Sequence, residues 1–275
     1  MKVLLVTLAD SNYIDAAKQF FSGVYFNGKW CGDCMLLAQR VPGREFRWFR
    51  ERGIRIKECA PLQEGDIGSW NSSTFSKFYL FGEEFKRWDK VIFMDPDIII
   101  RGSLDGLVKK SGFFAAQDVG GKKLYQQFID CKNIKSLRLR QKYNRLKKRY
   151  DLNQPAFNAG VLVFDTKLIR KGTQARFLRL FKLYKDLIFY GDQALFNLIF
   201  QGKWQKLSSE YNVYVNYLVI YRRINPDKVD GKVLHFAALG GIYKPWHPKH
   251  SFYREWARNR GKADLVDFKL QYDKE

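Results

Sequence analysis

Short apolar runs alternate with amphipathic stretches along the N-terminal part of the chain. Strands are predicted over Lys2–Leu8, Cys34–Ala38 and Ile54–Glu58, where apolar or alternating residues are bounded by turn-forming ones. Between them, Tyr13–Asn27 places its apolar residues on one helical face, and Phe46–Arg52 predicts a shorter helix. This strand–helix–strand rhythm favours a parallel sheet with helices on its faces.

The same rhythm continues toward the C-terminus without an internal repeat or a low-complexity linker. The sequence therefore predicts one compact α/β domain and not separable units. Helices are predicted over Ser73–Phe85, Ala175–Leu187 and Ala194–Phe200, and strands over Gly112–Ala116, Phe157–Phe164 and Val233–Phe236.

The most apolar segment is Val91–Ile100, with the sequence VIFMDPDIII. Its apolar, β-branched character predicts a buried central strand that ends at the carboxylates. Pro96 lacks an N–H and favours an extended Asp95, which helps the strand end there. Asp95 and Asp97 are two positions apart, so on an extended backbone their side chains point the same way.

Two neighbouring carboxylates need a cation or hydrogen-bond donors if they are buried. Mg²⁺ and Mn²⁺ prefer oxygen ligands of this kind and often also hold a substrate diphosphate. The alternative is a solvated Asp-Pro-Asp turn, because a DxD pattern is short and common.

The charge of the chain points to an anionic partner. Lys and Arg number 49 against 28 Asp and Glu, a net charge of +21 over 275 residues. Such an excess favours binding to a nucleotide, an acidic membrane surface, a polyanion or nucleic acid. The four cysteines include one CxxC, Cys31 and Cys34. We interpret the cysteines as small buried or strand-edge residues in preference to a zinc site or redox pair.

No apolar run approaches the length that spans a bilayer, and the stretch MKVLLVTLAD is too short for a signal sequence. We therefore expect a cytoplasmic protein, with peripheral contact at the inner membrane surface as an option.

Cations are concentrated in residues 119–154, which hold eleven Lys and Arg against Asp130 and Asp151. The favoured interpretation is a basic surface helix that packs one stripe on the core. The alternative is a helix that lies on anionic lipid, or a lid over a phosphorylated donor. The apolar stripe at helical spacing consists of Leu139, Tyr143, Leu146 and Tyr150.

Other polar residues occur before and after the DxD motif. Together with the motif they form an ordered set: Lys77, Asp95-Pro96-Asp97, Asp118, Asn158-Ala159-Gly160, Asp192-Gln193, His235 and Lys244-Pro245-Trp246. Taken with Leu8 and Tyr13 in VTLADSNY, this ordered set resembles glycosyltransferase family 8 over most of residues 1–250. That family includes glycogenin, plant galactinol synthases and bacterial lipopolysaccharide glycosyltransferases.

The resemblance implies a GT-A fold, a Rossmann-like, mostly parallel mixed sheet flanked by helices. It also implies a UDP-sugar donor, Mn²⁺ or Mg²⁺, and transfer of a hexose with retention to a glycan, glycolipid or protein acceptor. On the family pattern, Asp95, Asp97 and His235 would ligate the metal, and Leu8 and Tyr13 would line the uridine pocket. Lys77 and Lys244 would contact donor phosphates or sugar. Asp118, Asn158, Gly160, Asp192 and Gln193 would surround the transferred sugar, with Gly240 or Gly241 beside the diphosphate.

These implied roles fit the chemistry of glycosyl transfer. Charge builds on the leaving diphosphate, where a divalent cation and the two lysines would stabilise it. The sugar becomes oxocarbenium-like, and a carboxylate such as Asp192 would stabilise that cation. Lys77, Asp192 and Gln193 are therefore the catalytic candidates. Each also has an ordinary structural interpretation: Asp192 as a helix N-cap, His235 as a strand-end histidine, and Lys77 as a solvated lysine.

The resemblance also suggests how the chain is divided. Residues 1–117 would form the nucleotide-binding half and 118–250 the sugar and acceptor half, with the basic stretch 119–154 as an insertion longer than in glycogenin. Residues 251–275 would form a basic, aromatic tail.

Two competing functions remain open at this point. A basic module that binds nucleic acid or anionic membrane without catalysis would explain the charge. Against nucleic acid, no nucleic-acid motif matches, and aromatic and basic residues are not interleaved as a stacking platform. A metal-dependent phosphodiester hydrolase could use Asp95 and Asp97, but two-metal sites usually need more clustered ligands than three histidines late in the chain provide.

Overall fold

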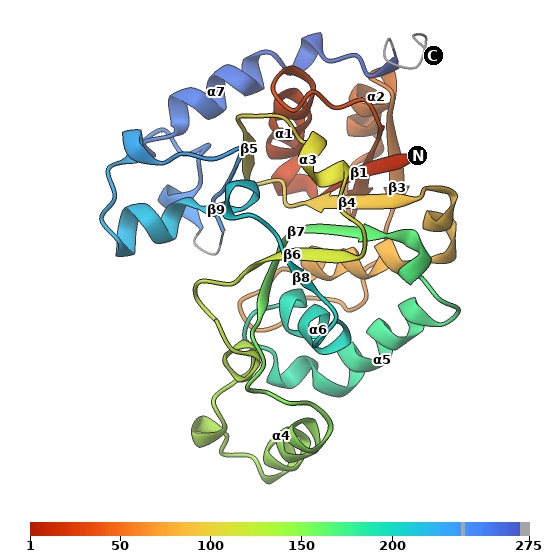
Figure 1. Cartoon of the computed structure of the whole chain (residues 1–275), viewed down its shortest axis with the longest axis vertical. Helices are drawn as coiled ribbons and strands as arrows, with labels where there is room; N and C mark the ends of the chain where they lie inside the picture. The colour runs from red at the N-terminus through yellow and green to blue at the C-terminus, as the bar shows by residue number, and fades with distance from the viewer. Residues whose placement is uncertain (238–239, 270–275) are drawn as a thin grey trace.

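A seven-stranded sheet forms the centre of the computed structural model, which describes residues 1–237 and 240–269 (Figure 1). Strands β3, β2, β1 and β4 pair in parallel with one another, and β6 pairs in parallel with β8, whereas β7 runs antiparallel to both β4 and β6. The predicted mixed, mostly parallel sheet is therefore confirmed. In spatial order the strands are β3 Ile54–Glu58, β2 Asp33–Ala38, β1 Val3–Ala9, β4 Lys90–Met94, β7 Phe157–Asp165, β6 Phe113–Gln117 and β8 Gln205–Lys206.

Helices cover both faces of this sheet (Figure 1). Successive residues of β1 point to opposite faces, so Leu4 and Val6 join one buried cluster while Val3 and Leu5 join the other. On one face lie α1 Ile14–Phe26, α2 Gly43–Glu51, α3 Asp105–Val108 and α7 Tyr253–Gly261, and on the other α5 Thr173–Tyr184 and α6 Asp192–Ile199. These layers form a single domain of the expected α/β class.

The C-terminal residues up to 269 pack onto this domain. Ser22 of α1 donates a hydrogen bond to the carbonyl of Asn259 in α7 at 2.6 Å. The Phe268 ring makes an edge contact with Phe21, with ring centroids 6.3 Å apart.

The apolar run around the DxD motif divides between two sheets. β4 ends at Met94, and Ile98–Ile100 forms β5 of a three-stranded sheet with β10 Val233–His235 and β9 Val213–Tyr214. β10 is antiparallel to β5, with His235 opposite Ile98. The turn at Asp95–Asp97 therefore joins the two sheets, and the strand pairing carries His235 to the DxD motif.

The predicted helix over Ser73–Phe85 differs in type from the observed one. The structure has a 3₁₀ helix at Ser72–Phe81 and a second at Glu83–Arg87, separated by an extended Gly82. Phe75, Phe78 and Phe81 are fully buried. A spacing of three places them on one side of a helix with three residues per turn, so the observed 3₁₀ geometry buries all three rings together.

The basic stretch forms α4, Leu137–Arg149, which lies apart from the sheet beyond α5 and α6 (Figure 1). Tyr143, Leu146 and Tyr150 are buried and Leu139 is half-buried, so the predicted packed stripe is confirmed.

The cysteines behave largely as expected. Cys34 and Cys59 are buried with free thiols, whereas Cys31 is exposed and also free. The side chain of Cys131 lies outside the described part of the structure. Within the described residues, no helix has the length and apolar character needed to cross a membrane.

Candidate active site

One edge of the sheet collects the polar residues of the ordered set. Parallel strands β1, β4 and β6 end there, and each is followed by a carboxylate: Asp10, Asp95 and Asp118. β7 runs the other way, so its beginning lies at the same edge and brings Asn158 and Gly160 to it. The arrangement follows the rule that ligands of such sheets bind beyond the carboxyl ends of the strands.

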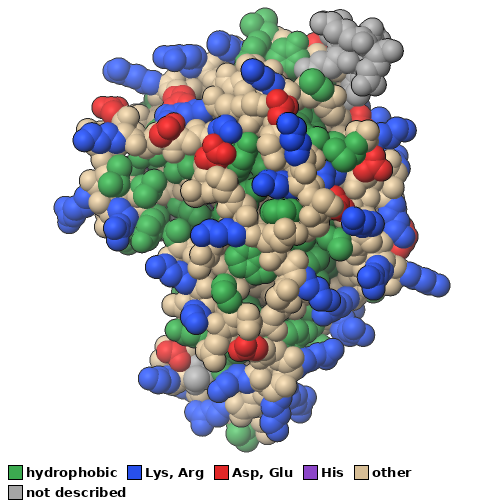
Figure 2. Space-filling model, viewed as in Figure 1, with side chains coloured by type: hydrophobic (Ala, Val, Ile, Leu, Met, Phe, Trp, Pro, Cys, Tyr) green, Lys and Arg blue, Asp and Glu red, His purple; other side chains and the backbone are tan. Residues whose placement is uncertain are grey.

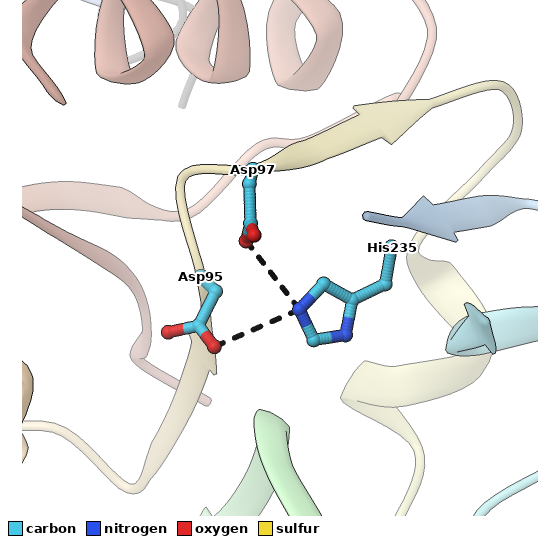
Figure 3. A group of neighbouring side chains, drawn as sticks. All are labelled: Asp95, Asp97 and His235. Atoms are coloured by element: carbon cyan, nitrogen blue, oxygen red, sulfur yellow. Dashed lines mark ion pairs between the residues drawn. The ribbon is translucent and has the colours of Figure 1, made fainter. Parts of the chain in front are cut away.

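Asp95, Asp97 and His235 form a cluster whose candidate ligand atoms all lie within 4.8 Å of one another. The Nε2 atom of His235 is 3.7 Å from Oδ2 of Asp95 and 3.4 Å from Oδ1 of Asp97 (Figure 3). His235 and Asp97 are buried, and Asp95 is half-buried. The alternative interpretation, a solvated Asp-Pro-Asp turn, is therefore wrong.

Each carboxylate of the DxD motif presents one oxygen to His235 and the other to a lysine. Lys77 Nζ lies 2.9 Å from Oδ1 of Asp95, and Lys244 Nζ lies 2.5 Å from Oδ2 of Asp97. Both lysines are at least nine-tenths buried. Two cations thus flank the cluster without occupying the oxygens that face the histidine.

Buried ion pairs set the charge of these groups. Burial alone would raise the pKa of Asp97, but Lys244 and His235 outweigh it and hold that pKa well below its usual range. Burial alone would lower the pKa of Lys77, but Asp192 and Asp95 raise it, so the ammonium stays charged. Lys77 is therefore not a solvated surface lysine but a buried cation between two acids.

Asp192 is held in place by the start of α6. Gly191 is the helix N-cap, with φ +58° and a position where a Cβ would meet Trp70 at 2.9 Å, so Asp192 is the first helical residue and not the cap. Its Oδ2 atom lies 3.1 Å from Lys77 Nζ. Burial raises the pKa of Asp192 to about 6, with Lys77 opposing the shift and Asp95 adding to it.

A chain of hydrogen bonds joins the sugar-side candidates. Gln193 accepts from Asn158 Nδ2 at 2.9 Å and from the Ala159 N–H at 3.1 Å. It donates to Oδ2 of Asp118 at 2.8 Å. Gln127 donates to the same Asp118 oxygen at 3.2 Å. Asp118, Asn158 and Gln193 are thus fixed in one buried polar network.

Gly160 lies where no side chain fits. A Cβ on this residue would stand 2.1 Å from Cε1 of His235 and 2.9 Å from Oδ1 of Asn158. The Gly160 carbonyl accepts from the Asp95 N–H at 2.8 Å. The glycine therefore lets β7 approach the DxD turn and the histidine ring closely.

The residues expected to line the nucleotide pocket lie close to the DxD turn, since β1 is next to β4 and Lys244 pairs with Asp97. Leu8 is buried at the end of β1. Tyr13 packs edge-on against Trp246, with ring centroids 5.5 Å apart, and burial together with Asp97 raises its pKa. Gly241 has φ +59°, a backbone conformation that favours glycine, and it begins the 3₁₀ turn before Lys244.

The donor set of the cluster fits a small divalent ion. Two carboxylate oxygens and one imidazole nitrogen converge on one point, and carboxylates suit Mn²⁺ and Mg²⁺ while an imidazole favours Mn²⁺ of the two. Asp95, Asp97 and His235 would hold such an ion and leave positions for other ligands.

A cavity of about 1150 Å³ adjoins the polar network. Asp118 and Asn212 line it together with Tyr214 and Tyr217. Four cations and four carboxylates line it, and two of the cations are paired: Arg101 lies 2.6 Å from Glu255, and Lys232 lies 3.2 Å from Glu210. The cavity thus combines aromatic rings with balanced charge, a lining suited to a hydroxylated ligand.

Sequence reasoning missed four residues of this region. Asp10 accepts from Ser73 Oγ at 3.2 Å, and its place directly after β1 was a usable signal. Trp70, Gln127 and Asn212 come from loops or 3₁₀ turns, and no local pattern marks them.

Comparisons with known proteins agree with this architecture. The sequence model described as "Glycosyl transferase family 8" matches residues 36–250. Glycosyltransferase GlyF of Streptococcus pneumoniae is 23% identical over 261 residues, covering 90% of this chain and 58% of GlyF. Galactinol synthase 2 of Arabidopsis thaliana is 24% identical over 215 residues, 75% of this chain and 61% of the synthase. The chain thus spans about three-fifths of these relatives.

Solved structures show the same fold. An active-site mutant of LgtC superposes with a TM-score of 0.70 at 20% identity, covering 94% of this chain and 95% of LgtC. The galactosyltransferase LgtC in complex with donor and acceptor sugar analogs superposes with a TM-score of 0.67, again covering 94% of this chain and 95% of LgtC. These are GT-A glycosyltransferases, so the expected GT-A fold is confirmed. Since the family model covers most of the sequence, this chain belongs to glycosyl transferase family 8.

Proposed function

We propose that the protein is a Mn²⁺-dependent retaining glycosyltransferase that moves a hexose from a UDP-sugar to a glycan, lipid-linked or protein acceptor. The observation that carries the proposal is the buried Asp95–Asp97–His235 cluster flanked by Lys77 and Lys244. Family membership favours this transferase over a binding module without catalysis and over a hydrolase.

The proposed reaction breaks the bond between the anomeric carbon and the diphosphate, with the electron pair leaving on UDP. The oxygen of an acceptor hydroxyl forms the new bond to that carbon, and its proton passes to the departing UDP or to water. When bound, the metal ion supplies positive charge to the leaving diphosphate. Lys77 and Lys244 add two buried ammonium groups beside it, in surroundings where charges interact more strongly than in water.

The sugar would lie over Asp192 and the polar network. A carboxylate at this position stabilises positive charge that develops on the ring, and Gln193, Asn158 and Asp118 offer donors and acceptors for sugar hydroxyls. Retention follows either from attack on the face that the diphosphate leaves or from two displacements through Asp192. The cavity lined by Tyr214 and Tyr217 is the proposed acceptor side, where paired charges and aromatic rings favour a glycan.

A donor panel tests the proposal directly. With Mn²⁺, the protein should release UDP from UDP-glucose or UDP-galactose, slowly even when water is the only acceptor. Nucleotide release measures turnover, mass spectrometry of the protein detects hexoses attached to its own tyrosines, and proton NMR of the product gives the anomeric configuration. Absence of turnover with every nucleotide sugar would refute the proposal, and an inverted anomer would refute retention.

We further propose that α4 places the enzyme on an anionic membrane surface, with the cytoplasmic face as the expected location. Most Lys and Arg side chains of the helix are exposed, and the lower part of the molecule, where α4 lies in Figure 1, carries many Lys and Arg side chains (Figure 2). Leu137 at the start of α4 is 70% exposed. The exposed cations of α4 are Arg138, Arg140, Arg145, Lys147, Lys148 and Arg149.

Removal of three of these cations should weaken binding to vesicles that contain phosphatidylserine. Each Lys or Arg near an anionic leaflet contributes roughly 1 kcal/mol, so Arg138→Gln, Arg145→Gln and Lys148→Gln together should lower the partition coefficient about 100-fold at low salt. Vesicle sedimentation measures it. The matched control removes three charges from α2 with Arg44→Gln, Arg47→Gln and Arg50→Gln. Equal binding to neutral and anionic vesicles, or equal losses in both variants, would contradict the proposal.

A further inference from the structure

Asn212 contacts the histidine of the cluster from the side opposite the carboxylates. It follows the 3₁₀ turn Ser209–Tyr211 and is only 1% exposed. Its Oδ1 atom lies 2.8 Å from Nδ1 of His235, while Nε2 of the same ring faces Asp95 and Asp97. The two ring nitrogens therefore meet different chemistry: an amide oxygen on one side and two carboxylates on the other.

Neighbouring hydrogen bonds decide which way the Asn212 amide points. Oδ1 of Asn158 accepts the Gly160 N–H at 2.8 Å, so this atom is fixed as an acceptor by the backbone. Asn212 donates to it through Nδ2 at 3.1 Å. With its NH₂ group committed there, Asn212 can offer His235 only its oxygen. The ring must then carry a proton on Nδ1.

The rest of the network supports the same orientation. Asn158 donates through Nδ2 to Oε1 of Gln193, which also accepts the Ala159 N–H. Two backbone N–H groups thus orient two side-chain amides, and these orient Asn212. A flipped Asn212 would set an NH₂ group against Nδ1 and leave its oxygen facing the Asn158 oxygen.

We propose that Asn212 is a positioning residue that holds a proton on Nδ1 of His235, so that the lone pair of Nε2 points at the metal. The inference rests on the proposed metal-dependent function. The ring proton and the metal ion compete for Nε2. If the proton were on Nε2, the N–H group would donate to Asp95 or Asp97, and no lone pair would be left there for the ion. An acceptor on the far side of a ligating histidine fixes its tautomer and orientation.

Nitrogen NMR of the ring tests the tautomer without any donor or turnover. The chain has three histidines, His235, His247 and His250, so protein labelled with ¹⁵N-histidine gives few signals. In metal-free wild-type protein, at a pH high enough for the ring to be neutral, His235 should show a protonated Nδ1 and an unprotonated Nε2. In Asn212→Leu the proton should move at least in part to Nε2, where Asp95 and Asp97 would accept it. A bare Nδ1 in wild-type protein would overturn the inference, whether or not the variant folds.

Metal affinity gives the second readout. Loss of such an acceptor typically weakens metal binding about 10–100-fold, so Asn212→Leu should raise the Mn²⁺ dissociation constant by that factor in electron paramagnetic resonance titrations. Asn212→Asp keeps an acceptor for Nδ1 but sets its second oxygen against Oδ1 of Asn158, so it should recover the tautomer and only part of the affinity. Asn216→Leu is the matched control: Asn216 is also buried, donates to the Ala237 carbonyl at 3.2 Å, and its loss should leave both readouts unchanged.

The outcomes separate this inference from the proposed function. Asn212→Leu with unchanged tautomer and unchanged Mn²⁺ affinity would overturn the positioning role, even if the enzyme turns over UDP-sugars. Failure of every nucleotide sugar to react would overturn the proposed function, while the ring tautomer and metal titrations would still decide the role of Asn212.

Discussion

Replacement of Asp97 by Asn should abolish Mn²⁺-dependent binding of UDP and lower turnover by about 10²–10³-fold or more. Comparable losses follow the removal of one preorganised charge stabiliser in other enzymes. Asp97 is buried, and its two oxygens serve different partners, Lys244 at 2.5 Å and His235 at 3.4 Å. Asn keeps the shape but removes the charge, so the ion loses an anionic ligand and Lys244 loses its counter-charge. Calorimetric titration with UDP, with and without Mn²⁺, measures the effect.

A second buried aspartate provides the matched control. Asp165 pairs with Lys90 at 2.7 Å and is 8% exposed, but it lies at the opposite edge of the sheet, where β4 begins and β7 ends. Asp165→Asn should lower stability because it leaves Lys90 without a counter-charge, yet it should leave metal-dependent UDP binding intact. Wild-type affinity for UDP and Mn²⁺ in Asp97→Asn would contradict the assignment of the metal site.

The sheet was predictable because its strands are short apolar runs whose pattern determines their type. Ile54–Glu58 was predicted with its observed bounds, and β1, β2, β4, β6, β7 and β10 were placed within one residue, whereas the two-residue strands β8 and β9 were not predicted. The type of the helix at Ser72–Phe81 was not predicted, since phenylalanines spaced by three and four residues suit both helix types. Nor did the sequence indicate that Ile98–Ile100 leaves the main sheet, because a β-branched run has no preference between two sheets.

The site was predictable where residues follow strands and unpredictable where they come from turns. Asp95, Asp97 and Asp118 stand directly after β4 and β6, and topology alone brings them to one edge. His235 reaches them through the pairing of β10 with β5, a contact across more than a hundred residues that only the family resemblance indicated. Asn212 carries no sequence signal, because its importance lies in which atoms of His235 and Asn158 it meets.

Asp192→Asn should separate catalysis from binding. If the Asp192 carboxylate stabilises positive charge on the sugar, its neutral isostere should lower kcat by about 10²–10³-fold while the affinity for UDP, which lacks the sugar, stays near that of the wild type. Lys77 keeps its ion pair with Asp95 at 2.9 Å, so the phosphate side remains charged. Turnover within tenfold of wild type would contradict this role, and a parallel loss of UDP affinity would indicate a structural one.

The same substitution should make the protein more stable at neutral pH. Burial raises the pKa of Asp192 to about 6 in the folded protein, above its ordinary value, so the folded state binds a proton that the unfolded state has released. The stability of the wild type therefore falls as pH rises from about 4 through 6. A shift of this size corresponds to at most about 3 kcal/mol, a loss that the neutral amide of the variant would not suffer.

Thermal unfolding of both proteins between pH 4 and 7 measures this difference. The midpoint of Asp192→Asn should exceed that of the wild type by a margin that grows with pH and levels off above about 6. Asp165→Asn should instead lower the unfolding midpoint: burial raises the pKa of Asp165, but Lys90 and Ser111 outweigh it and lower that pKa, so its charge stabilises the fold.

A destabilised Asp192→Asn at pH 7 would mean that the ion pair with Lys77 outweighs the cost of burying the carboxylate. A stabilised but inactive variant would mean that the chain retains a destabilising charge at the position where the proposed chemistry needs it.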